Sequence, residues 1–142
     1  MGTYYINEAA FELPNLGFAD ETIHVLRAKG SRDGDINVLV FRSKLEKPRP
    51  PREVVTAHRD NERRTLAGFA LLLDREVEVA GTFAIEGAIR YRNESGMIYQ
   101  RNAHFVSPEQ HLLVAVNGPF EDKETCDAAM DHVLSTFQLR KE

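Results

Sequence analysis

The sequence predicts an α+β fold, a largely antiparallel β-sheet with two main α-helices, from three observations. Extended segments fill the first third of the chain and recur after a predicted helix, so the order is strands, helix, strands, helix. Residues 82–106 alternate on both sides of a short polar turn, the pattern of a β-hairpin. Apolar residues recur at helical spacing over residues 122–137. The whole chain, residues 1–142, is expected to form a single domain.

The first third of the chain reads as three strands. Alternating and β-branched residues predict strands over residues 4–13, 21–28 and 36–45. In the second of these, Ile23 and Val25 fall on one face. The third is apolar almost throughout, which is typical of a central strand that is buried on both faces.

A proline-rich connection then leads into a helix predicted over residues 52–66. Proline is well tolerated at the first helical position, and Gly68 is expected to end the helix. The apolar stripe of this helix is thin, and Arg59, Arg63 and Arg64 are expected on a solvated face. The helix is therefore either peripheral and held by its ends, or its inner face meets something polar.

The second half of the chain adds strands over residues 69–79 and 111–116 on either side of the hairpin. The predicted hairpin register joins three pairs of residues: Tyr91 with Ile98, Ile89 with Gln100, and Gly87 with Asn102. One face of the hairpin is then apolar but carries two amides and His104, while the other carries Glu86 and Arg101 beside aromatic residues. An apolar surface with amides is either a core with a buried polar network or a binding surface.

Composition excludes several classes of function. A net charge of −4 disfavours nucleic acid as a partner, because phosphate binding needs a cationic surface. The chain lacks the roughly 20 consecutive apolar residues that span a bilayer, so direct membrane insertion is not expected. The N-terminus carries neither a basic region nor a continuous apolar segment, and Cys126 is a lone cysteine. We therefore expect a cytoplasmic protein.

The chain shows no pattern of catalytic residues. The five histidines have no metal-ligand spacing, although a site built from a histidine and carboxylates on distant strands stays open. Nucleophile-elbow, phosphate-loop and dinucleotide motifs are absent from the sequence. Cys126 lies on the apolar stripe of the last predicted helix and is expected to pack as a small hydrophobic residue. We therefore expect a binding protein that is not an enzyme and uses no cofactor or metal.

Five stretches of the chain, in their order, resemble a known family. They read YYINEAAFELP, DETIHVL, INVLVFRS, a polar helix ending in TLAGF, and GMIYQRNAHF. Together they resemble the Eag chaperones of bacterial type VI secretion, members of the DcrB-like group with a fold similar to Mog1 and PsbP. The resemblance spans almost the whole chain. DcrB itself is exported, so the lack of an export signal here favours the cytoplasmic chaperone branch.

The resemblance implies a partner and a binding surface. Eag chaperones are homodimers whose two concave sheets hold the N-terminal transmembrane segments of a secreted effector before it is loaded on the secretion apparatus. Carried over to this sequence, with Leu39 added by strand alternation, the groove residues are Ile23, Val25, Asn37, Leu39, Phe41, His58, Glu62, Leu66, Ile98, Gln100 and Asn102. Asn37 and Phe41 stand where relatives have small hydroxyl residues, and Glu62 stands where a small apolar residue is expected.

Elementary physics agrees with this assignment. A segment of roughly 20 apolar residues cannot stay exposed to water, and its burial is worth about 25 cal/mol per Å² of apolar area. Three alternatives remain at this stage. The same residues could form an internal core, the protein could be a Mog1-like regulatory module that binds a polar protein surface, or the concavity could hold a small ligand or a metal-dependent active site.

Overall fold

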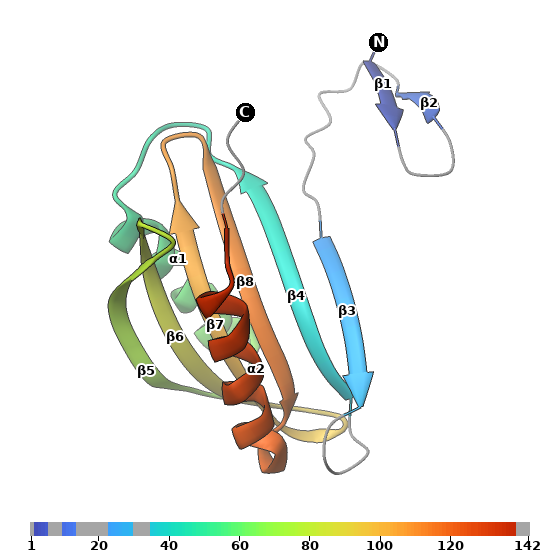
Figure 1. Ribbon diagram of the computed structural model, residues 1–142, viewed down its shortest axis with the longest axis vertical. Coiled ribbons are helices and arrows are strands. Elements are labelled where there is room, and N and C mark those ends of the chain that lie inside the picture. The colour runs from blue at the N-terminus through green and yellow to red at the C-terminus, as the bar shows by residue number, and fades with distance from the viewer. Residues whose placement is uncertain (1, 6–9, 14–22, 30–34, 139–142) are drawn as a thin grey trace.

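The computed structural model of the protein describes residues 2–5, 10–13, 23–29 and 35–138. Its main body is a six-stranded antiparallel sheet with the strand order β3-β4-β8-β7-β6-β5 (Figure 1). The strands of this sheet are β3 (Ile23–Lys29), β4 (Asp35–Lys44), β5 (Ala67–Val79), β6 (Thr82–Asn93), β7 (Gly96–Val106) and β8 (Gln110–Pro119). The α+β prediction is therefore confirmed.

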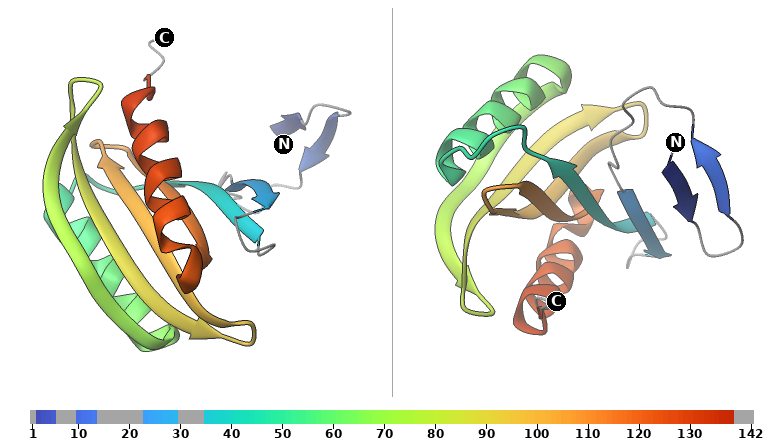
Figure 2. Two further views of the ribbon diagram at one scale, coloured as in Figure 1. Left: turned by 60° about the horizontal axis from the view of Figure 1, so that its bottom comes forward. Right: turned by 90° about the horizontal axis from the view of Figure 1, so that it is seen from above.

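Two α-helices in the described part of the chain pack on opposite faces of this sheet (Figure 2). Helix α1 (Pro51–Thr65) contacts β5, β6 and β7 on one face. Helix α2 (Lys123–Ser135) follows a short 3₁₀ turn, η1 (Phe120–Asp122), and contacts β7 and β8 on the other face. Since α1 packs mainly on the β5–β7 side, the β3–β4 side of its face is left more open.

A continuous hydrophobic core cluster lies between α2 and the sheet. Met130 and Cys126 of α2 are fully buried there against Tyr99, Phe105 and other apolar side chains of the sheet. This confirms the amphipathic helix and the packing of Cys126 as a hydrophobic residue. Burial, with a smaller effect of nearby carboxylates, raises the pKa of the Cys126 thiol to about 11, so the sulfur stays protonated.

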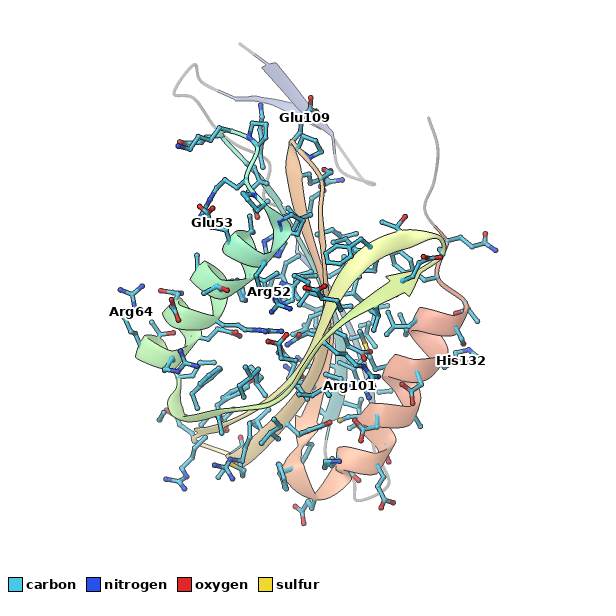
Figure 3. The ribbon with its side chains drawn as sticks, turned by 90° about the vertical axis from the view of Figure 1, so that its left-hand side faces the viewer. Arg52, Glu53, Arg64, Arg101, Glu109 and His132 are labelled. Atoms are coloured by element: carbon cyan, nitrogen blue, oxygen red, sulfur yellow. The ribbon has the colours of Figure 1, made fainter. Side chains whose placement is uncertain are left out.

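A buried polar network holds α2 to the sheet within this apolar setting. Arg101 Nη2 donates to Glu86 at 2.7 Å and Arg101 Nη1 donates to Asp127 of α2 at 3.1 Å. The Tyr99 hydroxyl donates to the same Asp127 carboxylate at 2.6 Å. Figure 3 shows Arg101 between the sheet and α2. The charges are therefore paired, as buried charges must be.

The hairpin register predicted from the sequence is confirmed at all three of its pairs.

The structure corrects the first predicted strand. Residues 4–13 do not form one strand, because β1 (Gly2–Tyr5) pairs antiparallel with β2 (Ala10–Leu13) in a separate two-stranded sheet. Residues 6–9 lie outside the described part of the chain. Alternation predicts extended backbone but does not show where the chain reverses.

Two further predictions need correction. Strand β4 lies inside the sheet between β3 and β8, but its residues 37–41 are only half-buried rather than covered on both faces. The reason is that neither helix packs mainly over this part of the sheet. Helix α1 ends at Thr65, and Leu66 is already extended, so Gly68 does not end the helix. Gly68 instead has φ +64° at a register shift of β5, a conformation that favours glycine.

Candidate functional site

The α1 face of the sheet carries an apolar surface that crosses three strands. Val25 of β3 lies opposite Leu39 of β4, and Leu39 lies opposite Ala115 of β8. In the next row, Phe41 lies opposite Leu113. Helix α1 borders this surface on the β7 side. We call this surface the trough; its residues are Val25, Asn37, Leu39, Phe41, His58, Glu62, Leu66, Gln100, His111 and Leu113.

Part of the trough is an open pocket of about 370 Å³ between α1 and the sheet. Its lining combines apolar and polar side chains: Phe41, Arg42, Ser43, His58, Glu62, Thr65, Leu66, Gln100, His111 and Leu113. Among the groove residues expected from the sequence, the pocket brings together Phe41, His58, Glu62, Leu66 and Gln100. The structure therefore gathers residues from α1, β4 and β7 into one site.

The other expected groove residues lie outside the pocket lining, and the structure leaves those it describes partly exposed, with one exception. Val25 is 52% exposed on the same face, and Leu39 and Ile98 are partly exposed. Ile23 lies opposite Phe41 in the register, and its side chain is outside the described atoms. Asn102 is the exception, because it is only 2% exposed on β7.

Asn102 is buried because α1 packs over its part of β7. Its Nδ2 donates to Gln100 Oε1 at 3.0 Å, so Asn102 positions the pocket residue Gln100 from the neighbouring place on the same face of β7. A Cβ added at Gly87, its cross-strand partner, would lie 2.5 Å from Arg59 Nη2 of α1 and 2.9 Å from Asn102 Oδ1. Only glycine leaves room for α1 at this point, and Asn102 does not reach the trough surface.

Ion pairs hold α1 over the sheet. Arg59 is only 5% exposed, and its Nη1 lies 3.0 Å from the Asp74 carboxylate of β5. Arg52 Nη1 donates to the same carboxylate at 2.9 Å. Figure 3 shows Arg52 on the side of α1 that faces the sheet and Arg64 on the side that faces away. The expectation of a solvated face is therefore wrong for Arg59, and the inner face of α1 is polar as well as apolar.

A line of hydrogen-bonded polar side chains crosses one end of the trough. Arg27 Nε donates to Asn37 Oδ1 at 3.0 Å, and Asn37 Nδ2 donates to Asn117 Oδ1 of β8 at 3.2 Å. Burial, and to a smaller extent the nearby Glu62 carboxylate, raises the pKa of Tyr91. A hydrogen bond between Tyr91 and Asn117 lowers this pKa but does not cancel the rise. Asn37 is thus satisfied within the protein. Sequence reasoning missed Asn117 because Asn-Gly-Pro reads as the end of a strand.

Three histidines meet at the other end of the trough. His104 Nδ1 and His111 Nε2 share a hydrogen bond of 2.9 Å, and the His58 ring lies edge-on to both rings at 5.3 and 5.8 Å. Burial and then the neighbouring histidines hold the pKa of His104 well below its usual value. Burial and then His58 lower the pKa of His111 to about 4. Near pH 7 these two rings are therefore neutral hydrogen-bonding groups.

Metal binding finds no geometric support in this cluster. Within the described residues, no group of three or more His, Cys, Asp or Glu side chains is arranged to hold a metal ion. The sequence alone did not place His111 in the site, because its position depends on how β8 pairs with β7. In that pairing His111 lies opposite Val106. Extending the predicted hairpin register to β8 would have placed His111 near the site.

The fold and the trough together define an α+β protein with one helix on each face of the sheet and a partly open, mixed apolar and polar trough beside α1. The chain belongs to the DcrB family, whose sequence model matches residues 8–136. No curated protein matches the chain. No helix in the described part of the chain is both long and apolar enough to cross a membrane.

One solved structure shares the fold over its whole length. It is a protein of unknown function from Pseudomonas aeruginosa, named as a candidate regulator, and it is 18% identical to this chain. The match has a TM-score of 0.79 and covers 100% of this chain and 99% of that chain. At this identity, the similarity establishes the arrangement of the elements and leaves the function to be argued from the site.

Proposed function

We propose that this protein is a cytoplasmic, non-enzymatic chaperone that binds the N-terminal transmembrane helices of a type VI secretion effector before loading. The observation that carries this proposal is the partly open trough. Val25 is exposed and Phe41 and Leu66 are half-exposed beside a pocket, on a sheet face that a second helix could cover. Membership of the DcrB family supports the proposal, because the Eag chaperones resemble this sequence within the same group.

The dimensions of the trough suit a membrane-spanning helix. Strand β4 has 10 residues, and a strand of that length extends about 33 Å. A transmembrane helix of roughly 20 residues is about 30 Å long. The pocket of about 370 Å³ is too small for a whole helix, so we propose that the helix lies along β4 and β8 and places a few side chains in the pocket.

Most of the amide groups of the trough are already hydrogen-bonded within the protein. Asn37 bonds to Arg27 and Asn117, and Gln100 Oε1 accepts from Asn102, so covering these amides leaves few groups unsatisfied. Transmembrane helices themselves associate through close packing and occasional polar contacts. The apolar residues of the trough would therefore supply most of the binding free energy, and the amides would add selectivity.

Leu66→Asp tests the proposal directly. The variant is co-expressed with a carrier protein fused to a 20-residue Leu/Ala-rich segment, and co-purification is quantified. A carboxylate opposite apolar surface costs at least about 1.4 kcal/mol, or tenfold in affinity. Leu72→Asp is the matched control, because Leu72 is exposed on β5 and does not line the pocket. Equal co-purification of both variants with the segment would contradict the proposal.

We also propose that the working form is a homodimer, as in the chaperones that the sequence resembles. Light scattering of the purified protein would give twice the mass of one chain, both for the wild type and for Leu66→Asp.

A second candidate function is a regulatory module that binds a polar protein surface. The exposed charged residues Asp60, Arg63 and Arg64 on the outer side of α1 favour it, and strongly salt-dependent binding would distinguish it.

A further inference from the structure

Glu62 is a largely enclosed carboxylate in the lining of the pocket. Its side chain is 15% exposed and lines the pocket beside Leu66, Phe41 and Leu113. Its one ion-pair partner within the described part of the chain is His58, whose Nε2 lies 3.6 Å from Glu62 Oε2. That separation is beyond a good hydrogen bond. A partner that covers the pocket must therefore deal with a carboxylate that the protein itself satisfies poorly.

The other two acidic residues of α1 are exposed and paired with arginines. Asp60 is 59% exposed and lies 3.1 Å from Arg63. Glu53 is also exposed and accepts a hydrogen bond from Arg49 at 3.0 Å. Both carboxylates have arginine partners, and neither residue lines the pocket. Among the acids of α1, Glu62 alone combines enclosure in the pocket with the lack of an arginine or lysine partner in the described part of the chain.

Gln100 places a hydrogen-bond donor in the same pocket. Its Oε1 already accepts from Asn102, so its amide nitrogen is the group left for a ligand. Gln100 Nε2 makes no hydrogen bond to another described residue, and it is not among the buried side-chain atoms that lack a partner. The pocket thus offers one strong acceptor, Glu62, and one donor, Gln100. A group that both donates and accepts hydrogen bonds matches this pair.

We propose that Glu62 is a specificity-determining residue that, with Gln100, selects apolar helices carrying a hydroxyl or amide side chain on the face that enters the pocket. This inference rests on the proposed function, because it names the chemistry of the segment that the trough binds. A purely apolar helix would cover the Glu62 carboxylate without satisfying it, at a desolvation cost. A Ser, Thr, Asn or Gln side chain would form a charge-assisted hydrogen bond, and such residues are tolerated inside membranes.

The test uses fluorescence anisotropy with labelled 20-residue Leu/Ala peptides that have lysine at both ends. One peptide is otherwise apolar, four carry a single serine at successive positions so that one serine faces the pocket, and four carry lysine at the same positions. We expect the best serine peptide to bind the full-length wild type at least about tenfold more tightly than the apolar peptide. Glu62→Leu removes this preference, and Glu62→Gln, which keeps an acceptor oxygen, retains part of it.

Asp60→Asn is the matched control, since it removes one negative charge from α1 outside the pocket and should keep the full preference. Thermal unfolding checks that each variant is folded. An unchanged serine preference in Glu62→Leu overturns the specificity role while leaving the proposed function in place. A larger gain for lysine than for serine also overturns it, because the site would then select a cation. If no peptide binds the wild type, the proposed function fails together with this inference.

Discussion

The two faces of the sheet are built in different ways. On the α2 face, Met130 and Cys126 are fully buried in a continuous apolar core, and the charges of Arg101 and Glu86 are paired with each other. On the α1 face, ion pairs to Asp74 and two buried valines, Val54 and Val55, hold the helix on a sheet surface where Ile85 and Ile89 are also fully buried, and the sheet beside the helix stays partly open. The comparison indicates that both helices bury apolar side chains, while α1 also forms a wall of the trough.

The largest expected difference between the faces is in stability. Met130→Ala removes a fully buried side chain from the α2 core and should lower the free energy of unfolding by about 2–5 kcal/mol. Leu66→Ala, in the half-exposed trough, should lower it by about 1 kcal/mol or less. Urea unfolding of both variants measures the two values. Equal losses would show that the trough is part of the stabilising core.

Acid should affect the α1 face before the α2 face. The pKa of His111 lies near 4 in the folded protein, below its ordinary 6.5, because the ring is buried near His58. Below pH 6.5 the unfolded chain therefore binds more protons than the folded protein. The free energy of unfolding has its full value above about pH 6.5 and falls toward pH 4, by at most about 1.4 kcal/mol per pH unit for each histidine with a lowered pKa. The measurement is urea unfolding as a function of pH.

On the α2 face, the acidic group with a lowered pKa is Asp127, which changes its charge at lower pH. Burial alone raises the pKa of Asp127, but hydrogen bonds from Tyr99, Arg101 and Lys123 outweigh it and hold the pKa below the ordinary 3.8. That stability is therefore lost only as the pH falls below about 3.8. His111→Gln should reduce the slope between pH 6.5 and 4, with His104 supplying what remains, whereas His132→Gln, on the exposed side of α2, should leave it as it is. An unreduced slope in His111→Gln would contradict the assignment.

The sequence predicted the local features well, for physical reasons. The hairpin register followed from a two-residue alternation around a short turn, and the last helix followed from the spacing of residues such as Cys126 and Met130. Both patterns are set by neighbours along the chain or across one turn. The trough residues from α1, β4 and β7 were named through a family resemblance, and the structure brings Phe41, His58 and Gln100 into one pocket.

The features that the sequence did not reveal depend on where α1 lies. Arg59 reads as a surface residue in a charged run, and it is buried only because Asp74 of β5 faces it. Asn102 was expected in the groove, but α1 crosses β7 and covers it. Strand β4 reads as fully buried, although the helices pack elsewhere. Helix position is a tertiary property that side-chain periodicity does not encode.

Cysteine labelling of the trough tests the central claim most directly. Cys126 is buried and stays a protonated thiol, so the wild type should react slowly with a maleimide. Phe41→Cys in the trough and Leu72→Cys on β5 should both react rapidly in the free protein. When the protein is co-purified with a carrier-fused Leu/Ala segment, we expect Phe41→Cys to become as slow as Cys126 and Leu72→Cys to stay fast. Rapid labelling of Phe41→Cys in that complex would contradict the account.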